Sequence, residues 1–263
     1  MSLEGLTILV TGGAGGIGQA ICQNLARQGA RVIVHYHTSK SEAEILAGEI
    51  GGFAVYADLR KKDEVDSMFN QIERKIGALQ CCVANAGFYP QESIPMWDIS
   101  EDRWNSTIES NLGITVLTAQ GFLKHAVTRG TGSLVLIGST AGIHGERGHS
   151  DYATAKGAIT TGLLRTLKND VSGTSIRVNA VAPGWTLTDS KIESGIDEKT
   201  ASDAMLTMSM KKLAYPEDVA GAVSFLLSET VSGHISGQVI EVSGGMEGRV
   251  IPGLGERNGH FVD

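Results

Sequence analysis

Short apolar runs alternate with longer amphipathic stretches along most of this chain. The first run, Leu6–Thr11, has the continuous apolar character of a buried strand, and a helical pattern follows it through Gln28. Because strands alternate with helices and crossovers between parallel strands are right-handed, the pattern predicts helices on both faces of one sheet. We therefore expect an α/β fold with a single doubly wound, Rossmann-like parallel sheet and a ligand crevice at the carboxyl ends of its strands. The other predicted strands are Arg31–Tyr36, Phe53–Ala57, Gln80–Ala84, Ser133–Gly138, Ser175–Ala180 and Val239–Val242.

Two long helical patterns, at about Arg103–Arg129 and Tyr152–Val171, are apolar on more than one face. A helix that covers a sheet buries one apolar stripe. The surplus predicts that these helices are also buried against a partner chain. The apolar residues are Ile108, Leu112, Val116, Leu117 and Phe122 in the first pattern, and Ala158, Ile159, Leu163, Leu164 and Leu167 in the second.

Length and composition favour one domain. The 263 residues suit a single α/β unit, and no repeat, low-complexity tract or proline-rich linker divides them. We expect one domain over residues 1–248 and a C-terminal tail over 249–263. The tail has little periodicity but several apolar residues, so we expect it either to lie across a neighbouring subunit or to be a disordered terminus.

Charge and cysteine content exclude several classes of partner. The chain has 22 basic and 29 acidic residues, a net charge of −7, and no segment with the concentrated positive charge that nucleic acid requires. Its apolar runs are far shorter than the ~20 residues of a membrane-spanning helix, and no secretory leader opens the chain. The 3 cysteines suit neither a disulfide framework nor a zinc site. We expect a cytoplasmic protein without a nucleic acid, membrane or metal partner.

The first predicted strand leads into a glycine-rich turn, Gly12-Gly-Ala-Gly-Gly-Ile-Gly18. Glycines let the backbone approach a pyrophosphate closely, and the N-terminus of the following helix offers N–H groups and partial positive charge to the anion. The spacing differs from the commoner dinucleotide fingerprint, and such a cluster alone is often only a flexible turn. Its place between a strand and a helix favours a dinucleotide site.

A tyrosine and a lysine lie four residues apart in the second long helical pattern. This spacing puts Tyr152 and Lys156 side by side on one helix face. A tyrosine titrates near ~10 and needs a lower pKa to exchange protons readily at neutral pH. An ammonium at ~4 Å supplies about 4 kcal/mol, enough to lower that pKa by ~2–3. Because the same spacing is common on solvated helix faces, the pair indicates catalysis only together with other motifs.

Together, these motifs resemble the short-chain dehydrogenase/reductase family, in its branch of 3-oxoacyl-carrier-protein reductases and sugar dehydrogenases. Ser139 precedes Tyr152 by thirteen residues, as the family's catalytic serine does, although Gly138 stands where many relatives carry a second serine. The resemblance runs from about Leu6 to Gly245 and implies an oxidoreductase that transfers a hydride between NAD(P)(H) and a carbonyl or secondary alcohol. Its motifs are Thr11–Gly18, Asn85-Ala-Gly87, Asn111, Ser139, Tyr152 with Lys156, Pro183-Gly184 and Ser243-Gly-Gly245.

Roles for individual residues follow from this resemblance. Tyr152 is expected to act as general acid or base, and Lys156 to tune it and bind the nicotinamide ribose. Ser139 is expected to hold the substrate oxygen, and Asn111 to complete a proton relay. Asp58 should meet the adenine, and Thr188 the nicotinamide end. The expected cofactor contacts are Gly12, Gly16, Ile17, Gly18, Tyr36, His37, Asp58, Leu59, Asn85, Ala86, Gly87, Tyr152, Lys156, Pro183, Gly184 and Thr188.

The end of the second predicted strand favours NADP over NAD. NAD selection uses a carboxylate there to hold the ribose hydroxyls. This chain instead has Tyr36 and His37, and His37, Ser39 and Lys40 could donate to a 2′-phosphate. NAD stays the alternative, because Ala14 and Gly15 stand where many NADP-using relatives carry a basic residue.

Two classes of function remain open. One is the oxidoreductase; the other is a nonenzymatic nucleotide sensor or scaffold on the same fold. The presence of all the catalytic motif residues favours the enzyme, because a sensor does not need them. The substrate is open: the acidic net charge disfavours an acidic carrier protein, although Lys124 and Arg129 could form a local basic patch. The resemblance also implies a homotetramer, in which the two long helices pair across a two-fold axis and the last strand forms the second interface.

Overall fold

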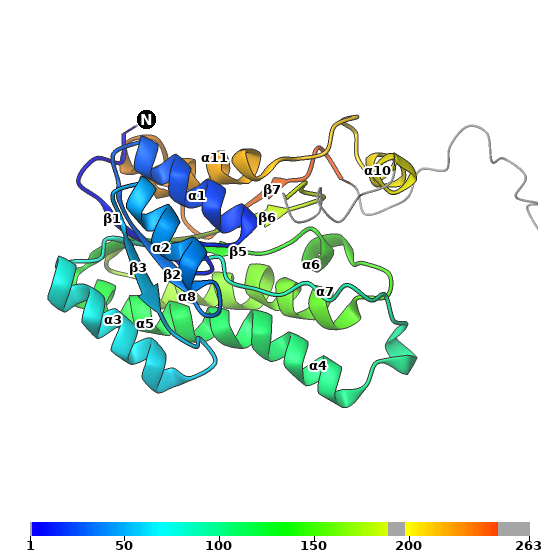
Figure 1. Ribbon diagram of the computed structural model, residues 1–263, viewed down its shortest axis with the longest axis horizontal. Coiled ribbons are helices and arrows are strands. Elements are labelled where there is room, and N and C mark those ends of the chain that lie inside the picture. Colours follow the sequence, from blue (N-terminus) through cyan, green and yellow to red (C-terminus); the bar gives the residue numbers. More distant parts are fainter. Residues whose placement is uncertain (1, 189–197, 247–263) are drawn as a thin grey trace, which may run out of the picture.

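One parallel sheet organises the part of the chain that the computed structural model describes, residues 2–188 and 198–246. Its strands are β1 (Thr7–Val10), β2 (Arg31–Tyr36), β3 (Phe53–Tyr56), β4 (Cys81–Ala84), β5 (Thr131–Ile137), β6 (Ser175–Pro183) and β7 (Val239–Val242). Neighbouring strands all pair in parallel, in the order β3-β2-β1-β4-β5-β6-β7 (Figure 1). The predicted doubly wound sheet is confirmed, and the strand order reverses between β1 and β4, where such folds bind ligands.

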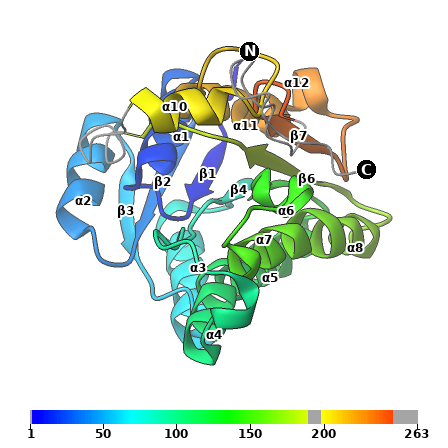
Figure 2. The ribbon, with the colours of Figure 1, turned by 90° about the vertical axis from the view of Figure 1, so that its right-hand side faces the viewer.

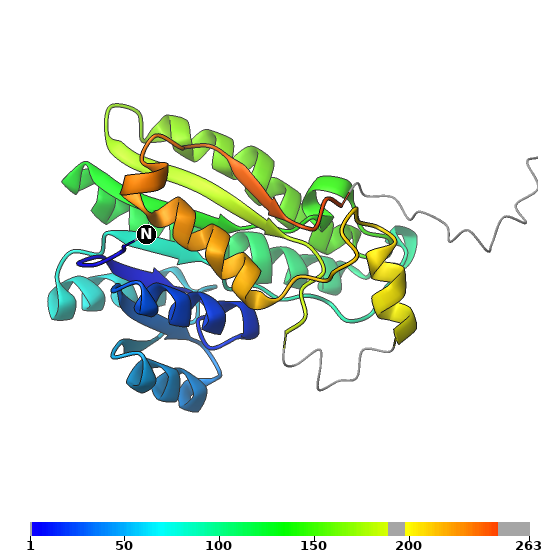
Figure 3. The same ribbon diagram turned by 90° about the horizontal axis from the view of Figure 1, so that it is seen from above.

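Two layers of helices enclose the sheet (Figures 1 and 2). Helices α1 (Gly16–Arg27), α2 (Lys40–Glu49) and α11 (Pro216–Leu227) cover one face, on which α1 and α11 lie side by side (Figure 3). Helices α3 (Lys62–Ile76), α5 (Ile114–Arg129) and α8 (Leu164–Asp170) cover the other face. The remaining helical elements are η1 (Met96–Asp98), α4 (Glu101–Ile108), η2 (Glu109–Gly113), α6 (Ala141–His144), α7 (Ser150–Gly157), η3 (Ala158–Leu163), α10 (Glu198–Met205) and α12 (Glu229–Ser232).

The central strands are buried on both faces, which explains their continuous apolar runs. In β1, Ile8 and Val10 pack in the layer of α1 and α11, whereas Leu9 packs in the layer of α3 and α5. Successive residues of a strand point to opposite faces, so a strand between two helical layers needs an apolar residue at every position. The sheet edge at the strands' carboxyl ends is thereby held rigidly.

Both predicted long helices contain a π-helical segment. The first runs through α4, η2 and α5 and begins at Glu101, two residues before the predicted start. The second runs through α7, η3 and α8 and ends at Asp170. A π turn inserts one residue into the helical ladder and is often found at functional sites. Here the first π segment holds Asn111, a residue predicted for the site.

The apolar surplus of these helices is only partly explained by the core. Phe122, Ile159 and Leu164 are buried. The others are partly exposed: Ile108, Leu112, Val116, Leu117, Ala158, Leu163 and Leu167.

Strand β6 continues to Pro183, three residues beyond its predicted end, because Pro183 still pairs with Val242 of β7. Among the helices of the described ranges, none is both long and apolar enough to cross a bilayer. The predicted tail over 249–263 lies outside the described residues.

Candidate active site

A large pocket, of about 1050 Å³, opens where the strands end. The segments that follow β1 to β6 form its walls, together with residues of α7 and η2. Every residue predicted for catalysis or cofactor binding lines it: Gly12, Gly16, Ile17, Gly18, Tyr36, His37, Asp58, Leu59, Asn85, Ala86, Gly87, Asn111, Ser139, Tyr152, Lys156, Pro183, Gly184 and Thr188. The structure thus brings the predicted site residues together, and their individual roles stay predictions.

The glycine turn packs its own backbone tightly at the start of α1. A Cβ atom at Gly18 would lie 2.1 Å from the carbonyl oxygen of Gly12 and 2.9 Å from Asn85 Nδ2. Gly12 has a φ of 61°, in the left-handed region that favours glycine. A Cβ atom at Gly16 would lie 2.9 Å from the Thr188 Cβ, so Thr188 contacts the N-terminus of α1. This turn has room for backbone only, as a pyrophosphate cradle requires.

Gly18→Ala should therefore weaken binding of the predicted NAD(P)(H) at least about tenfold, because the added methyl forces the turn open; overpacking of this kind costs ~1–3 kcal/mol or more. The matched control is Gly221→Ala in α11, where a Cβ atom would have no neighbour within 4 Å. Helix propensity predicts that this control is more stable than the parent by about 0.5–1 kcal/mol. Fluorescence titration with NADPH and thermal unfolding measure both effects. Parental affinity in Gly18→Ala would show that the turn does not hold the cofactor.

His35 of β2 holds the glycine turn in place, a role that the sequence analysis did not predict. Its Nδ1 accepts a hydrogen bond from the Gly12 N–H at 3.0 Å, and its Nε2 lies 3.0 Å from the Ala57 carbonyl oxygen. This arrangement requires the neutral ring with its proton on Nε2. Burial lowers the pKa of His35 to about 4, so the ring is neutral at physiological pH. The histidine joins the ends of three strands beneath the pocket.

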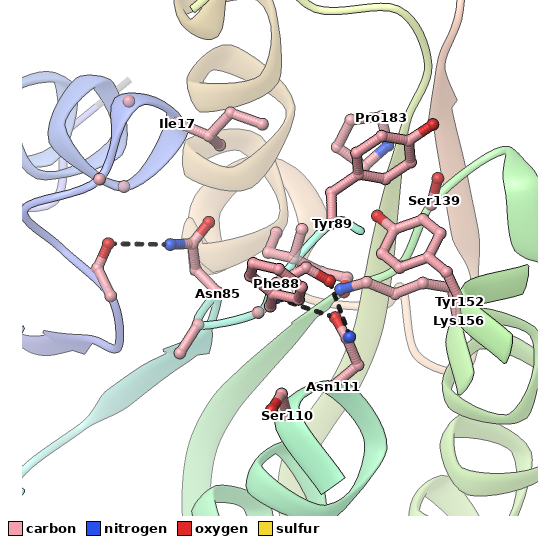
Figure 4. A pocket seen from close by; sticks show the side chains of 18 of the residues that line it. Ile17, Asn85, Phe88, Tyr89, Ser110, Asn111, Ser139, Tyr152, Lys156 and Pro183 are labelled. Atoms are coloured by element: carbon pink, nitrogen blue, oxygen red, sulfur yellow. Dashed lines mark hydrogen bonds between the residues drawn. The ribbon is translucent and has the colours of Figure 1, made fainter. Parts of the chain in front are cut away.

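Asn85 ties the segment after β4 to the end of β1. Its Nδ2 donates to the Thr11 carbonyl oxygen at 2.9 Å, while Thr11 Oγ1 accepts from the backbone N–H groups of Asn85 and Ala86 at 3.0 and 3.1 Å. A Cβ atom at Gly87 would lie 2.9 Å from Asn111 Oδ1. These contacts fix Asn85-Ala-Gly87 between the glycine turn and the residues predicted for catalysis (Figure 4).

Asp58, the predicted adenine contact, is at the centre of a charged cluster. Arg60 donates from Nε and a terminal nitrogen to the two Asp58 carboxylate oxygens at 2.9 and 2.8 Å. His37 Nε2 and Lys61 Nζ each lie 3.8 Å from the same carboxylate. The Arg60 hydrogen bonds hold the pKa of Asp58 well below its usual range. Arg60 lines the pocket but was not among the predicted site residues, because an arginine that follows a strand is usually solvated.

Asn111 is aimed into the pocket by the π turn. Its Nδ2 donates to the carbonyl oxygens of Phe88 and Thr107 at 2.8 and 3.0 Å, and its Oδ1 accepts from the Phe88 N–H at 3.2 Å. Asn111 is fully buried. In a regular helix the amide of a buried asparagine has few partners; here it binds the backbone of the loop after β4. Figure 4 shows this amide beside the Lys156 ammonium.

Burial affects the pKa of the Tyr152 hydroxyl more than the neighbouring Lys156 does. It raises the pKa of Tyr152 to about 12, although a hydrogen bond with Ser139 lowers it. Lys156 Nζ lies 5.7 Å from the centre of the Tyr152 ring and donates to the Ile137 carbonyl oxygen at 3.0 Å. Burial also lowers the pKa of Lys156 to about 8. The expected lowering of the Tyr152 pKa is therefore not found in the protein alone, because desolvation disfavours both charged forms.

Comparison with known proteins identifies relatives over nearly the whole chain. Residues 12–247 match a family model described as "Enoyl-(Acyl carrier protein) reductase". A 3-oxoacyl-[acyl-carrier-protein] reductase of Thermotoga maritima is 30% identical over 252 residues, which are 94% of this chain and 99% of the relative. One of Mycobacterium tuberculosis is 33% identical over 240 residues, 91% of this chain and 92% of the relative. The solved structure of a short-chain type dehydrogenase/reductase from Mycobacterium ulcerans matches with a TM-score of 0.86 and 27% identity, covering 93% of this chain and 90% of that one.

Proposed function

The chain belongs to the short-chain dehydrogenase/reductase family of NAD(P)-dependent oxidoreductases, and on that basis we propose that it reduces a ketone to a secondary alcohol with Tyr152 as proton donor. The observation that carries this proposal is the place of the Tyr152 hydroxyl, which lies beside Ser139 in the pocket that the glycine turn also lines (Figure 4). A phenol with a raised pKa keeps its proton at neutral pH until a substrate oxygen takes it. The comparisons give no support to the nonenzymatic alternative.

The roles proposed for the other site residues follow from their positions. Ser139 lies beside the hydroxyl of Tyr152 in the same pocket, so one substrate oxygen can contact both groups, and the serine stabilises the charge that develops there. Lys156 points from α7 toward the amide of Asn111 (Figure 4). We propose that Lys156 and Asn111 return a proton to Tyr152 after each turnover.

The residues around the glycine turn fit a nicotinamide dinucleotide. Gly12, Gly16 and Gly18 leave backbone N–H groups of α1 open to a pyrophosphate, because side chains cannot fit there. The charged cluster around Asp58 suits the adenosine end. Bound in this pocket, the cofactor supplies the hydride in reduction and accepts it in oxidation.

We propose NADP as the preferred cofactor. His37 and Ser39 line the pocket after β2, and the structure adds Arg60 to them. NADPH should give a kcat/KM at least about tenfold above that of NADH, because these groups can donate to a 2′-phosphate. The end of β2 carries no carboxylate, and the charge of the neighbouring Asp58 carboxylate is balanced by Arg60. Steady-state assays with both cofactors measure the ratio. A preference for NADH would reverse the assignment, and Arg60→Ala should lower the ratio if the assignment holds.

For the substrate we propose a 3-oxoacyl group, because the relatives reported above are named for it. The predicted basic patch does not support docking of an acidic carrier at Lys124 and Arg129, since Lys124 pairs with Asp66 at 3.1 Å and Arg129 with Glu73 at 2.8 Å. Absorbance at 340 nm, followed with NADPH and an acetoacetyl thioester, tests the proposal against a panel of sugars, polyols and simple ketones. If none of these compounds is turned over, the proposed reaction is refuted.

We also propose a homotetramer. A second copy of the chain is expected to pack on the partly exposed apolar residues of the two long helices. These residues include Leu112, Val116 and Leu163. Light scattering should give four times the chain mass of 27.7 kDa. A monomeric protein would contradict the assembly, and a chain that ends at Gly248 tests whether the tail takes part in it.

A reducing compartment such as the cytoplasm is the proposed location. Cys22, Cys81 and Cys82 are buried and unpaired. Burial raises the pKa of Cys22 and Cys81 to about 12, so both are protonated and unreactive. Oxidation of these thiols is therefore not part of the proposed function.

A further inference from the structure

Tyr89, on the loop after β4, lies beside the proposed proton donor. Its ring meets the ring of Tyr152 edge-on, with centroids 5.1 Å apart and an interplanar angle of 86°. Figure 4 shows the Tyr89 ring next to the hydroxyl ends of Tyr152 and Ser139. All three residues line the pocket. The Tyr89 ring therefore occupies space next to the place where a substrate would react.

Contacts with the loop before α7 fix the position of this ring. The Tyr89 hydroxyl donates to Glu146 Oε1 at 2.6 Å. The ring also stacks on that of His149, with centroids 4.9 Å apart and an interplanar angle of 19°, and His149 is buried. A hydrogen bond to a carboxylate and a stacked ring each favour one side-chain conformation. Tyr89 is thus held both at its hydroxyl and on one ring face.

The backbone on either side of Tyr89 is held as well. Before it, the Phe88 N–H donates to Asn111 Oδ1 at 3.2 Å, and the Phe88 carbonyl oxygen accepts from Asn111 Nδ2 at 2.8 Å. After it, the Pro90 carbonyl oxygen lies 3.0 Å from His149 Nε2, and the proline ring fixes its own φ. Tyr89 is therefore part of a rigid wall that joins the loop after β4 to the loop before α7.

The reach of a reacting carbonyl group places one of its substituents against this wall. A carbonyl oxygen that accepts from the Tyr152 hydroxyl lies about 2.7 Å from it, and the carbonyl carbon is about 1.2 Å further away. The first atoms of both substituents then lie within about 5 Å of the hydroxyl, the region that the Tyr89 ring adjoins. The hydrogen bond from Tyr89 to Glu146 closes this side of the pocket.

We propose that Tyr89 is a specificity-determining residue that restricts the alkyl group of the substrate to a short chain. The inference rests on the proposed reduction of a 3-oxoacyl group, whose carbonyl carbon carries a thioester arm and an alkyl group. The arm connects to the carrier and must leave the pocket, so the alkyl group is the substituent that faces the closed side. Because the Tyr89 ring fills that side, a longer chain has to displace it.

The dependence of kcat/KM on chain length tests this inference. Acetoacetyl and 3-oxooctanoyl thioesters of N-acetylcysteamine are compared with NADPH by absorbance at 340 nm. The parent should prefer the acetoacetyl thioester at least about tenfold, since one methylene in a confined pocket changes kcat/KM about 10–200-fold. Tyr89→Ala should lower this preference at least about tenfold, because removal of the ring leaves room for the chain. The Glu146 carboxylate stays solvated in this variant, since its side chain is 30% exposed.

Two controls separate the size of the ring from other effects. Tyr89→Phe keeps the ring without its hydroxyl and should keep most of the preference. Trp97→Ala removes an aromatic side chain of the same loop that is 85% exposed and is not part of the pocket lining, so the preference should not change. An unchanged preference in a Tyr89→Ala protein that still binds NADPH would overturn the inference. A parent that reduces both thioesters equally well would overturn it without any variant. If the parent reduces neither thioester, the proposed function fails instead.

Discussion

A Tyr152→Phe protein should bind NADPH as tightly as the parent but reduce its substrate about 10³-fold more slowly, because general acid catalysis contributes roughly 10²–10⁴-fold. The phenyl ring keeps the edge-on contact with Tyr89, at a centroid distance of 5.1 Å. What it loses is the hydroxyl that donates the proton and contacts Ser139.

Two measurements separate this role from a structural one. Fluorescence titration with NADPH should give an unchanged affinity, and single-turnover absorbance at 340 nm should give the loss in rate. Ser139→Ala is the companion variant: it removes the hydroxyl that hydrogen-bonds Tyr152 and should cost less than Tyr152→Phe, because the proton donor remains. Turnover of Tyr152→Phe within tenfold of the parent would exclude Tyr152 as the general acid.

The sheet and the identity of the site could be predicted from the sequence for physical reasons. A strand buried on both faces must be apolar throughout, so a central strand such as β1 stands out as a continuous apolar run. The ends of β2 and of the partly exposed edge strand β7 were also predicted as observed. Parallel strands then place Gly12, Asn85 and Ser139 at one edge. The resemblance supplied the spacing of the catalytic motif residues, and the structure brings them together in one pocket.

The parts that sequence reasoning missed depend on contacts between distant residues. Tyr89 and Glu146 are 57 positions apart, and His35 reads as one more residue of a buried strand. The π turn at Asn111 leaves no pattern that distinguishes it from a regular helix. The direction of the Tyr152 pKa was wrong for a related reason: the spacing to Lys156 is local, whereas burial is a property of the folded chain.

Asp151, next to Tyr152 in the chain, illustrates how the fold holds the site. Its carboxylate is fully buried and accepts hydrogen bonds from Arg103 Nε at 3.0 Å, from Thr107 Oγ1 at 3.0 Å and from the Tyr152 N–H at 2.9 Å. Burial alone would raise the pKa of Asp151, but these hydrogen bonds outweigh it and lower the pKa. The carboxylate thus joins α4 to the first turn of α7, the helix that carries Tyr152 and Lys156.

The lowered pKa of Asp151 determines how its contribution to stability depends on pH. A carboxyl whose pKa is lower in the folded than in the unfolded state contributes its full stability above the unfolded value, near ~3.9. The contribution is lost as the pH falls through the folded value. Between pH 5 and 8 the Asp151–Arg103 pair should therefore hold the two helices with undiminished strength.

Asp151→Ala should lower the free energy of unfolding by about 3–5 kcal/mol, the typical cost of removing one partner of a buried ion pair. The loss has two parts: Arg103, whose side chain is only 16% exposed, keeps an uncompensated charge, and the Tyr152 N–H loses its acceptor. Urea unfolding at pH 7 measures it, with Asp102→Ala, an exposed acid on the same helix as Arg103, as the control expected within about 0.5 kcal/mol of the parent. The double variant Asp151→Leu with Arg103→Met should be more stable than Asp151→Ala, because no charge stays buried without a partner. If Asp151→Ala were as stable as Asp102→Ala, the pair would not hold α4 to α7.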